Sequence, residues 1–152
     1  MRRKDKEISD ESDIKAVIKK SNVCRLGMVN GNKPYIVPLC FGYQDNTLYF
    51  HGSLQGRKID LLRKNPNVCF EFDLVGETAE SQNACDWSMK YQSVIGFGKA
   101  VFVEDLDERR KALTIIMGQY SDRIFEFPEH TLKVTAVIKV EIDSITGKSS
   151  GF

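Results

Sequence analysis

The amino-acid sequence predicts a mainly β fold with minor α content, namely an antiparallel barrel or sandwich of about six strands with about three connecting helices. The first observation is that short β-prone runs follow one another across connections of hairpin length. The second is that the final run, 131–148, alternates apolar and polar residues with the period of a half-buried strand. The third is that only three helical patterns separate these runs, which disfavours a doubly wound sheet.

Length and composition limit the class of protein. The chain has 152 residues, which fits one domain over 1–152 with a core of its own. Lysine and arginine number 22 against 21 acidic residues, and a net charge of +1 favours neither nucleic acid nor an anionic membrane as a partner. The charged N-terminus contains no apolar signal region, and no run is apolar enough for a membrane span. We therefore expect a soluble, cytoplasmic protein.

The first third of the chain predicts a helix followed by a three-stranded meander. Ser9 or Asp10 caps a short helix that ends at "KKSN". The runs "VCRLGMV", "YIVPLCFGY" and "LYFHG" are then typical of strands, and the turn-rich "NGNKP" and "QDNT" connect them. Pro38 lies inside the second run and cannot donate a ladder hydrogen bond. We therefore expect an edge strand, a bulge, or a place where a ligand covers the backbone.

The remaining elements alternate between helices and strands. A helix is expected from about Gly56 to Asn65, where "NP" ends it, and "NVCFEFD" is typical of the next strand. The polar segment Leu74–Lys90, which contains Trp87, is expected to be a long excursion with a functional reason. Strand character resumes in "YQSVIGFGKAVFVED", "DERRKALTIIMGQY" predicts an amphipathic helix, and 131–148 forms the last strand.

Two cations, Arg57 and Lys58, open the helix that follows "LYFHGSLQG". A helix start has unpaired backbone N–H groups and the positive end of the helix dipole, so two added cations favour an anion there, in particular a phosphate. The alternative is that both residues are ordinary solvated residues on an exposed helix face.

The sequence contains none of the familiar self-contained catalytic motifs, neither a P-loop nor G-x-G-x-x-G, G-x-S-x-G or H-E-x-x-H. The only histidines are His51 and His130. His130 follows "FPE" and is expected to be solvated in a loop. His51 ends a strand near the two cations, which makes it either a contact to a ligand or a structural residue bonded to the backbone.

The cysteines do not predict a metal site. Their spacing is wide, with no C-x-x-C and no histidine pair nearby, so we expect no bound metal. Cys24, Cys40 and Cys69 lie in apolar strand-like runs and are expected to be core residues in a reducing compartment, while Cys85 lies in the polar excursion.

Aromatic and apolar residues around "VPLCFGY" and "LYFHG" could wall a flat ligand whose anionic tail lies at the helix start, and flavin mononucleotide (FMN) has this shape. The stretch "YIVPLCFGYQDNTLYFHGSLQGRKIDLLRKNPNVCFEF" resembles the core of the pyridoxamine 5'-phosphate oxidase-like, FMN-binding split β-barrel flavoproteins. The later "CDWSMKYQSVIGFGKAVFVED" is most similar to the branch that contains the nitroimidazole-resistance flavoproteins. The likeness runs from about Arg25 to Glu104, with weaker support from 1–8 and 135–148.

The resemblance implies a split β-barrel that binds FMN, with FAD possible, at the interface of a homodimer. Residues 35–40 would run along the isoalloxazine, 50–51 would border the ribityl chain, and Ser53 with the two cations would take the phosphate. Ser93 stands where the family tends to place a glutamine near the flavin. The implied cofactor-binding residues are Tyr35, Ile36, Val37, Pro38, Leu39, Cys40, Phe50, His51, Gly52, Ser53, Arg57, Lys58 and Ser93, and His51 is also the candidate catalytic residue.

The resemblance further implies an FMN-dependent oxidoreductase of the nitroimidazole- or nitroaromatic-reductase type, with small molecules as electron donor and acceptor. Tyr35 and Cys40 stand where the true oxidases have basic residues, and no tryptophan and arginine segment follows the last expected strand. Oxidation of pyridoxamine phosphate is therefore not expected. Two alternatives stay open, a flavin carrier or sensor without turnover of its own and a barrel that binds another phosphate-bearing ligand.

Overall fold

One antiparallel sheet of eight strands dominates the structure, a computed structural model that describes residues 3–151. This confirms the predicted mainly β, antiparallel class. The strands are β1 (Glu7–Ile8), β2 (Cys24–Asn30), β3 (Lys33–Leu39), β4 (Gly42–Gln44), β5 (Thr47–Ser53), β6 (Asn67–Ala79), β7 (Ser88–Phe102) and β8 (Thr135–Ser150). The helices are α1 (Glu11–Lys20), α2 (Arg57–Lys64), α3 (Leu106–Gly118) and α4 (Glu129–Val134), with short 3-10 turns at Lys4–Lys6 and Ala84–Asp86.

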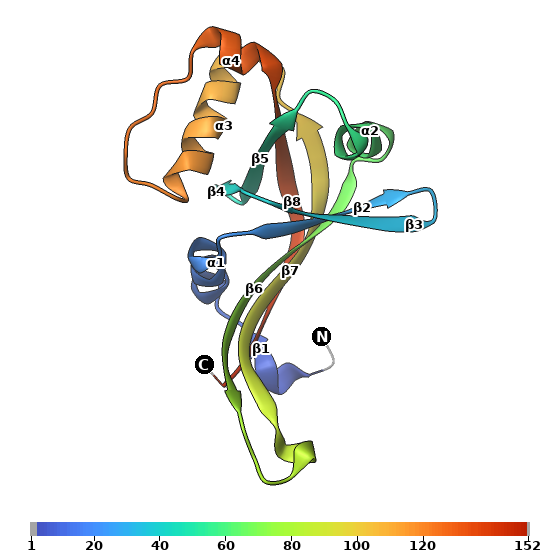
Figure 1. Cartoon of the computed structure of the whole chain (residues 1–152), viewed down its shortest axis with the longest axis vertical. Coiled ribbons are helices and arrows are strands. Elements are labelled where there is room, and N and C mark those ends of the chain that lie inside the picture. Colours follow the sequence, from blue (N-terminus) through green and yellow to red (C-terminus); the bar gives the residue numbers. More distant parts are fainter. Residues whose placement is uncertain (1–2, 152) are drawn as a thin grey trace.

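The sheet curls into a barrel that stays open on one side. Its strand order is β3-β2-β6-β7-β8-β5-β4, and β1 adds to β8. β3 and β4 follow each other in the chain yet form the two ends of this order, and within residues 3–151 they do not pair with each other. This is the split barrel that the sequence resemblance implies (Figure 1).

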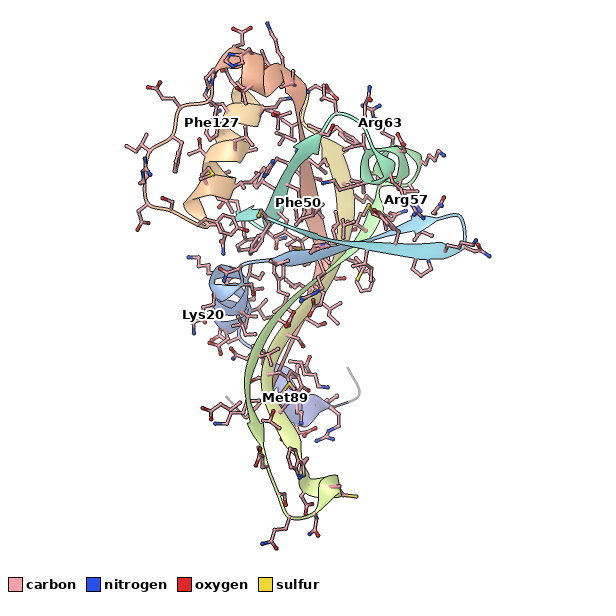
Figure 2. The ribbon with its side chains drawn as sticks, in the orientation of Figure 1. Lys20, Phe50, Arg57, Arg63, Met89 and Phe127 are labelled. Atoms are coloured by element: carbon pink, nitrogen blue, oxygen red, sulfur yellow. The ribbon has the colours of Figure 1, made fainter. Side chains whose placement is uncertain are left out.

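Phenylalanine rings and the apolar face of α1 contribute to one core cluster inside the barrel. Phe41 and Phe72 lie with ring centroids 4.8 Å apart, and Phe70 and Phe72 lie 6.0 Å apart. Phe50 is completely buried in the same core cluster (Figure 2). Asp10 caps α1 by accepting a hydrogen bond from the Ser12 backbone N–H at 2.7 Å. A second apolar cluster joins α3 and α4 to the outer side of the barrel at Val103, Ala112, Leu113, Ile116, Leu132 and Val137.

The run "YIVPLCFGY" is two strands, although the sequence predicted one. The break falls at Cys40 and Phe41, because the fully buried Phe41 ring turns into the core. At Gly42 the chain passes so close to α3 that a Cβ atom would lie 2.7 Å from the Ile116 backbone nitrogen. A side chain at this position would push β4 away from α3, so glycine permits the contact.

The expected last strand begins four residues too early. Residues 131–134 belong to α4, which starts after Pro128 and places the fully buried Leu132 in the cluster against α3. Tertiary packing therefore overrides the alternating pattern at its first residues. α4 is also the fourth helix, where the sequence predicted about three, and His130 lies exposed in it rather than in a loop.

The polar segment Leu74–Lys90 is mostly strand rather than an irregular excursion. β6 and β7 continue as a ladder to Ala79 and Ser88, with a register shift between Val75 and Thr78. Figure 1 shows them as a long arm that extends away from the barrel. Polar composition concealed the ladder, because an arm with two solvated faces does not require apolar residues at every second position.

The cysteines differ from the expectation that three of them are core residues. Cys24 is fully buried, and burial raises the pKa of its thiol above the usual value. Cys40 is exposed, since it stands where β3 ends, and Cys69 is only half-buried on the outward side of β6. Throughout residues 3–151, no helix combines the length and apolar character that a bilayer crossing requires.

Candidate functional site

The open side of the barrel exposes backbone edges of two strands. β3 pairs only with β2 among the described residues, so Pro38 lies on an edge strand. An edge strand was one of the three possibilities that the sequence predicted for Pro38. β4 covers β5 only as far as Tyr49, which leaves the second edge of Phe50–Ser53 without a β partner in the described chain. Unpaired strand edges present N–H and C=O groups that a ligand can satisfy.

The start of α2 offers further free donors. Gly56 precedes the helix with φ of +121°, and no side chain caps this end. The first backbone hydrogen bond of the helix runs from Asp60 N–H to Gly56 C=O at 3.1 Å, so the preceding N–H groups of the first turn remain available. A Cβ atom at Gly56 would meet nothing within 4 Å, so the residue before the helix is not covered by other parts of the described chain on that side.

Arg57 connects α2 to β3. Its guanidinium carbon lies 4.4 Å from the centre of the Tyr35 ring, within the range of a cation–π contact. The contact fixes the guanidinium plane above the ring while the side chain stays exposed, so its N–H groups can still donate to an anion. Figure 2 shows Arg57 between α2 and the β2–β3 hairpin.

Lys58 connects α2 to β5. Its Nζ donates to the backbone carbonyl of His51 at 3.5 Å, and a Cβ atom at Gly52 would lie 3.0 Å from this Nζ. Partial burial lowers the pKa of Lys58, and the pKa of His51 is lowered first by desolvation and then by the Lys58 charge. An anion beside Lys58 would oppose both shifts.

The remaining candidate residues near α2 have distinct placements. Ser53 accepts a hydrogen bond from the Gln55 backbone N–H at 3.3 Å, in the turn that leads to α2. The Phe50 side chain is buried in the core, so only its backbone can reach a ligand at the open edge. On β3, Val37 and Leu39 pack partly against the core, whereas Ile36 is 63% exposed on the opposite face.

The structure does not bring Ser93 to the other candidates within one chain. Ser93 pairs with Lys148 on β8, whereas His51 pairs with Val137, eleven residues earlier on the same strand. At about 3.3 Å per residue, roughly 35 Å of strand separates the two positions. On the other side of β7, Ser93 pairs with Asp73 of β6.

Two features of the structure were not predicted. The first is that exposed apolar side chains share the outer face of the sheet, which is the face that points away from the core. Ile36, Gly27, Cys69 and Phe97 form one cross-strand row on it. The exposed members are Val29, Ile36, Val75, Met89, Ile95 and Phe97. Apolar residues at both odd and even positions of "SVIGFG" were the signal that could have shown it.

The second feature is the tyrosine hydroxyl that joins α3 to the split. Tyr120 accepts a hydrogen bond from Phe41 N–H and donates one to the carbonyl of Asn22, both at 3.0 Å. Burial is the main cause that raises the pKa of Tyr120 to about 12, so this hydroxyl stays protonated. No sequence motif indicates it, because its partners lie about 80 and 100 residues away along the chain.

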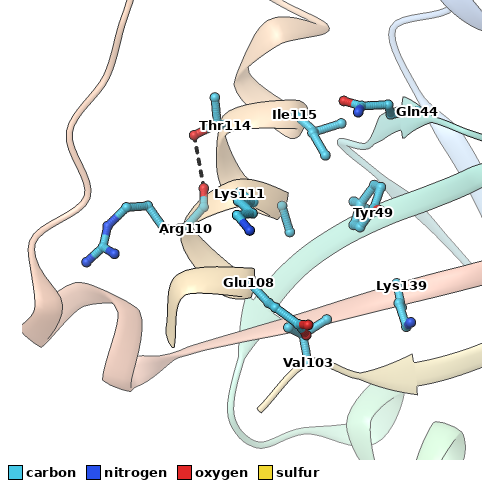
Figure 3. A pocket seen from close by; sticks show the side chains of 10 residues that line it. Gln44, Tyr49, Val103, Glu108, Arg110, Lys111, Thr114, Ile115 and Lys139 are labelled. Atoms are coloured by element: carbon cyan, nitrogen blue, oxygen red, sulfur yellow. Dashed lines mark hydrogen bonds between the residues drawn. The ribbon is translucent and has the colours of Figure 1, made fainter. Parts of the chain in front are cut away.

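Within residues 3–151, no group of three or more His, Cys, Asp or Glu side chains is arranged to hold a metal ion. A groove of about 610 Å³ lies between α3 and the strands β5 and β8, away from the start of α2 (Figure 3).

Comparison with known proteins places this geometry in a family. The family described as pyridoxamine 5'-phosphate oxidase matches residues 10–149. Among curated proteins, an uncharacterised protein from Rhizobium meliloti is 31% identical over 64 residues, a match that spans only 42% of the length of either chain.

Solved structures share the fold over nearly the whole chain. A candidate 5-nitroimidazole antibiotic resistance protein from Bacteroides thetaiotaomicron is 36% identical, with a TM-score of 0.87 over 94% of this chain and 86% of that one. A FAD and heme binding protein from Mycobacterium smegmatis is 16% identical, with a TM-score of 0.89 over 97% and 74% of the two chains. The flavocytochrome Anf3 from Azotobacter vinelandii is 19% identical, with a TM-score of 0.87 over 100% and 72%. The family match covers most of the sequence, and the chain belongs to the pyridoxamine 5'-phosphate oxidase family.

Proposed function

We propose that the protein binds FMN at the start of α2 and acts as a flavin-dependent oxidoreductase. The observation that carries this proposal is the meeting of two cations, free helix N–H groups and two open strand edges at one place. A flavin nucleotide combines a phosphate with a planar ring whose polar edge needs hydrogen-bond partners. Relatives described as FAD-binding or flavocytochrome share the fold, which supports a flavin as the ligand.

The phosphate would lie against Arg57, Lys58 and the Ser53 hydroxyl, with the first N–H groups of α2 completing its shell. Residues 35–40 would pass along the ring and would donate and accept backbone hydrogen bonds through the free edge of β3. Gly52 leaves the space that Lys58 needs beside β5. FMN supplies one phosphate for one cationic site, and FAD would need a second site for its adenosine part.

A bound flavin supplies two-electron redox chemistry between a small-molecule donor and acceptor. This chain would orient it, exclude water from one face, and provide His51. Desolvation, followed by the Lys58 charge, lowers the pKa of His51 and favours its neutral imidazole, which can accept a proton or a hydrogen bond. A phosphate beside Lys58 would offset the second of these causes.

The acceptor class we propose is a nitroaromatic compound. The support is the 36% identity to a candidate 5-nitroimidazole antibiotic resistance protein, over 94% of this chain. A carrier or sensor of flavin without turnover is the second candidate function, because another solved relative is described only as a FAD-binding protein. Both candidates use the same binding residues.

The site is proposed to lie at the interface of a homodimer. Ile36, Val75 and Phe97 are each more than half exposed on the outer face, and a monomer rarely leaves such a continuous apolar stripe in water. A second copy would cover this face and would bring its own Ser93 toward the flavin. Ser93 of the same chain lies too far along the sheet to do so.

An absorption spectrum and a reoxidation assay test the proposal together. The purified protein should show the bands of an oxidised flavin, and mass spectrometry of the released ligand should identify FMN. The anaerobically reduced protein should then be reoxidised by a nitroaromatic acceptor. A colourless protein that takes up no FMN would refute flavin binding, and a flavin-loaded protein that no acceptor reoxidises would favour the carrier.

A further inference from the structure

The groove beside α3 has the size and walls of a ligand site. Its volume of about 610 Å³ falls within the range of roughly 300–1,000 Å³ that small-molecule sites occupy. One wall is α3, and the other is formed by β5, β8 and the end of β7 (Figure 3). We call this surface the α3 groove, and its lining residues include Tyr49, Val103, Glu108, Lys111, Ile115 and Lys139.

The floor of the α3 groove is apolar and aromatic. Tyr49 and Ile115 are half-buried and come from opposite walls, and Val103 is buried beneath them. The Tyr49 ring packs at the edge of the cluster that joins α3 to the sheet, which holds it in place. A rigid aromatic ring on an aliphatic floor favours a planar ligand.

Charged groups lie above this floor. Lys111 projects from α3 and makes no ion pair within residues 3–151. Lys139 comes from β8, and its pKa is raised first by a hydrogen bond to Glu141, at 3.0 Å, with smaller contributions from Glu108 and Tyr49. Arg110 pairs with Asp107 and points away from the α3 groove (Figure 3).

The α3 groove offers both positive and negative side chains to a ligand. Lys111 and Lys139 offer ammonium groups to an anion, while the exposed Glu108 carboxylate can accept a hydrogen bond and is also free of ion pairs in the described chain. A ligand that matches both features carries an acid group together with a hydroxyl or amine donor.

The α3 groove reaches β5, the strand that also carries His51. Tyr49 and His51 lie on the same face of β5, two residues and about 7 Å apart. His51 pairs with Val137, whose carbonyl accepts a hydrogen bond at 2.9 Å from the N–H of Val103 in the groove floor. A molecule in the groove therefore lies next to the strand position of the candidate catalytic residue.

We propose that the α3 groove binds a small aromatic carboxylate that carries a hydroxyl or amine donor. The ring lies against Tyr49 and Ile115, the carboxylate lies between Lys111 and Lys139, and the donor reaches Glu108. The place of this molecule as a reaction partner of the flavin rests on the proposed function, whereas its binding does not.

The test uses para-hydroxybenzoate as the probe and calorimetry on the full chain. The wild-type protein should bind it, and Lys111→Met should weaken binding about 10-fold or more, because one charge-assisted contact is lost. The matched control is Lys20→Met, an exposed lysine on α1, which should bind as the wild type does. Para-hydroxybenzyl alcohol, which lacks the carboxylate, should bind much more weakly than the probe.

Several results would overturn the proposal. These are no binding by the wild type, equal affinity in the two lysine variants, or loss of binding in Arg57→Ala/Lys58→Ala with Lys111→Met unaffected, which would move the ligand to the start of α2. Flavin content is measured separately in each sample. Binding of the probe by a protein without affinity for flavin would sustain the α3 groove while refuting the proposed function.

Discussion

Lys58 carries its charge into a half-buried position, where desolvation lowers its pKa below the ordinary value of 10.5. The unfolded chain binds this proton more tightly, so the charged residue destabilises the fold at neutral pH, and this cost disappears only above about pH 10.5. Residues at functional sites commonly reduce stability in this way. A phosphate bound beside Lys58 would offset this loss of stability.

The first prediction concerns Lys58→Met. This substitution should raise the melting temperature of the flavin-free protein, because it removes a desolvated charge and keeps the length of the side chain. It should weaken FMN binding about 10-fold or more through the lost charge-assisted contact. Thermal denaturation and flavin titration measure the two effects, with Lys64→Met on the exposed end of α2 as control. A lower melting temperature with unchanged FMN affinity would assign Lys58 a structural role through its bond to His51.

The second prediction separates catalysis from binding at His51. His51→Gln should leave flavin occupancy unchanged and slow the reoxidation of the reduced protein by a nitroaromatic acceptor, since a positioned acid or base typically contributes about 10²- to 10⁴-fold. The wild-type pH–rate profile should also contain a step from the titration of His51, and the variant should lack it. Equal flavin-normalised rates at all pH values would exclude a catalytic role.

At the scale of elements, the residues that follow α3 hydrogen-bond the segment between β3 and β4 to the end of α1 and the start of β2. Tyr120 joins Phe41, which lies between β3 and β4 and donates through its N–H, to Asn22, which lies between α1 and β2 and accepts through its carbonyl. Gln119 adds two hydrogen bonds of 2.9 Å to the carbonyls of Lys19 and Ser21 at the end of α1. The end of α3 thus fixes the segments that lead into β2 and out of β3, beyond the last pair of their ladder.

The third prediction follows from this contact. Tyr120→Phe keeps the ring and removes the hydroxyl, so two backbone groups lose a partner, and the free energy of unfolding should fall by about 1–3 kcal/mol. Urea denaturation measures it. Tyr43→Phe is the control, because the Tyr43 hydroxyl makes no hydrogen bond to the protein within residues 3–151. Equal losses in both variants would show that Tyr120 stabilises through packing alone.

Local patterns predicted those elements that local chemistry determines. Asp10 caps α1, and the "NP" after α2 ends it, because caps and prolines act on their immediate neighbours. The break between β3 and β4 and the helix α4 depend on where Phe41 and Leu132 are buried. Those contacts join distant segments, and the hydrophobic pattern within one stretch of sequence contains no information about them.

The same division applies to the candidate site. Arg57 and Lys58 were predictable because a helix start, a preceding strand and two cations are contiguous in sequence. Their contacts to Tyr35 and His51 were not, since these depend on how α2 packs across the sheet. Ser93 was proposed from resemblance alone, and its distance from His51 follows from the strand register of β8.

At the scale of the whole molecule, the exposed apolar side chains on the outer face of the sheet lead us to expect a homodimer. The fourth prediction is that Phe97→Asp weakens the homodimer at least 100-fold, because a two-fold interface receives the change twice and each copy buries an unpaired charge. Light scattering at several protein concentrations measures it. Ile124→Asp is the control, since Ile124 is 97% exposed in the loop before α4. A wild type that remains a flavin-loaded monomer would contradict the shared site.

The central claim, a flavin phosphate at the start of α2, is tested most directly by titrating FMN into three folded proteins. They are the wild type, Arg57→Ala/Lys58→Ala, and Arg63→Ala/Lys64→Ala, which removes two cations from the other end of the same helix. The fifth prediction is that the first pair of substitutions weakens FMN binding by about 100-fold or more, the loss of two charge-assisted contacts, while the second pair leaves it within a few-fold of the wild type. Equal FMN affinity in all three proteins, with unchanged circular dichroism, would contradict the account.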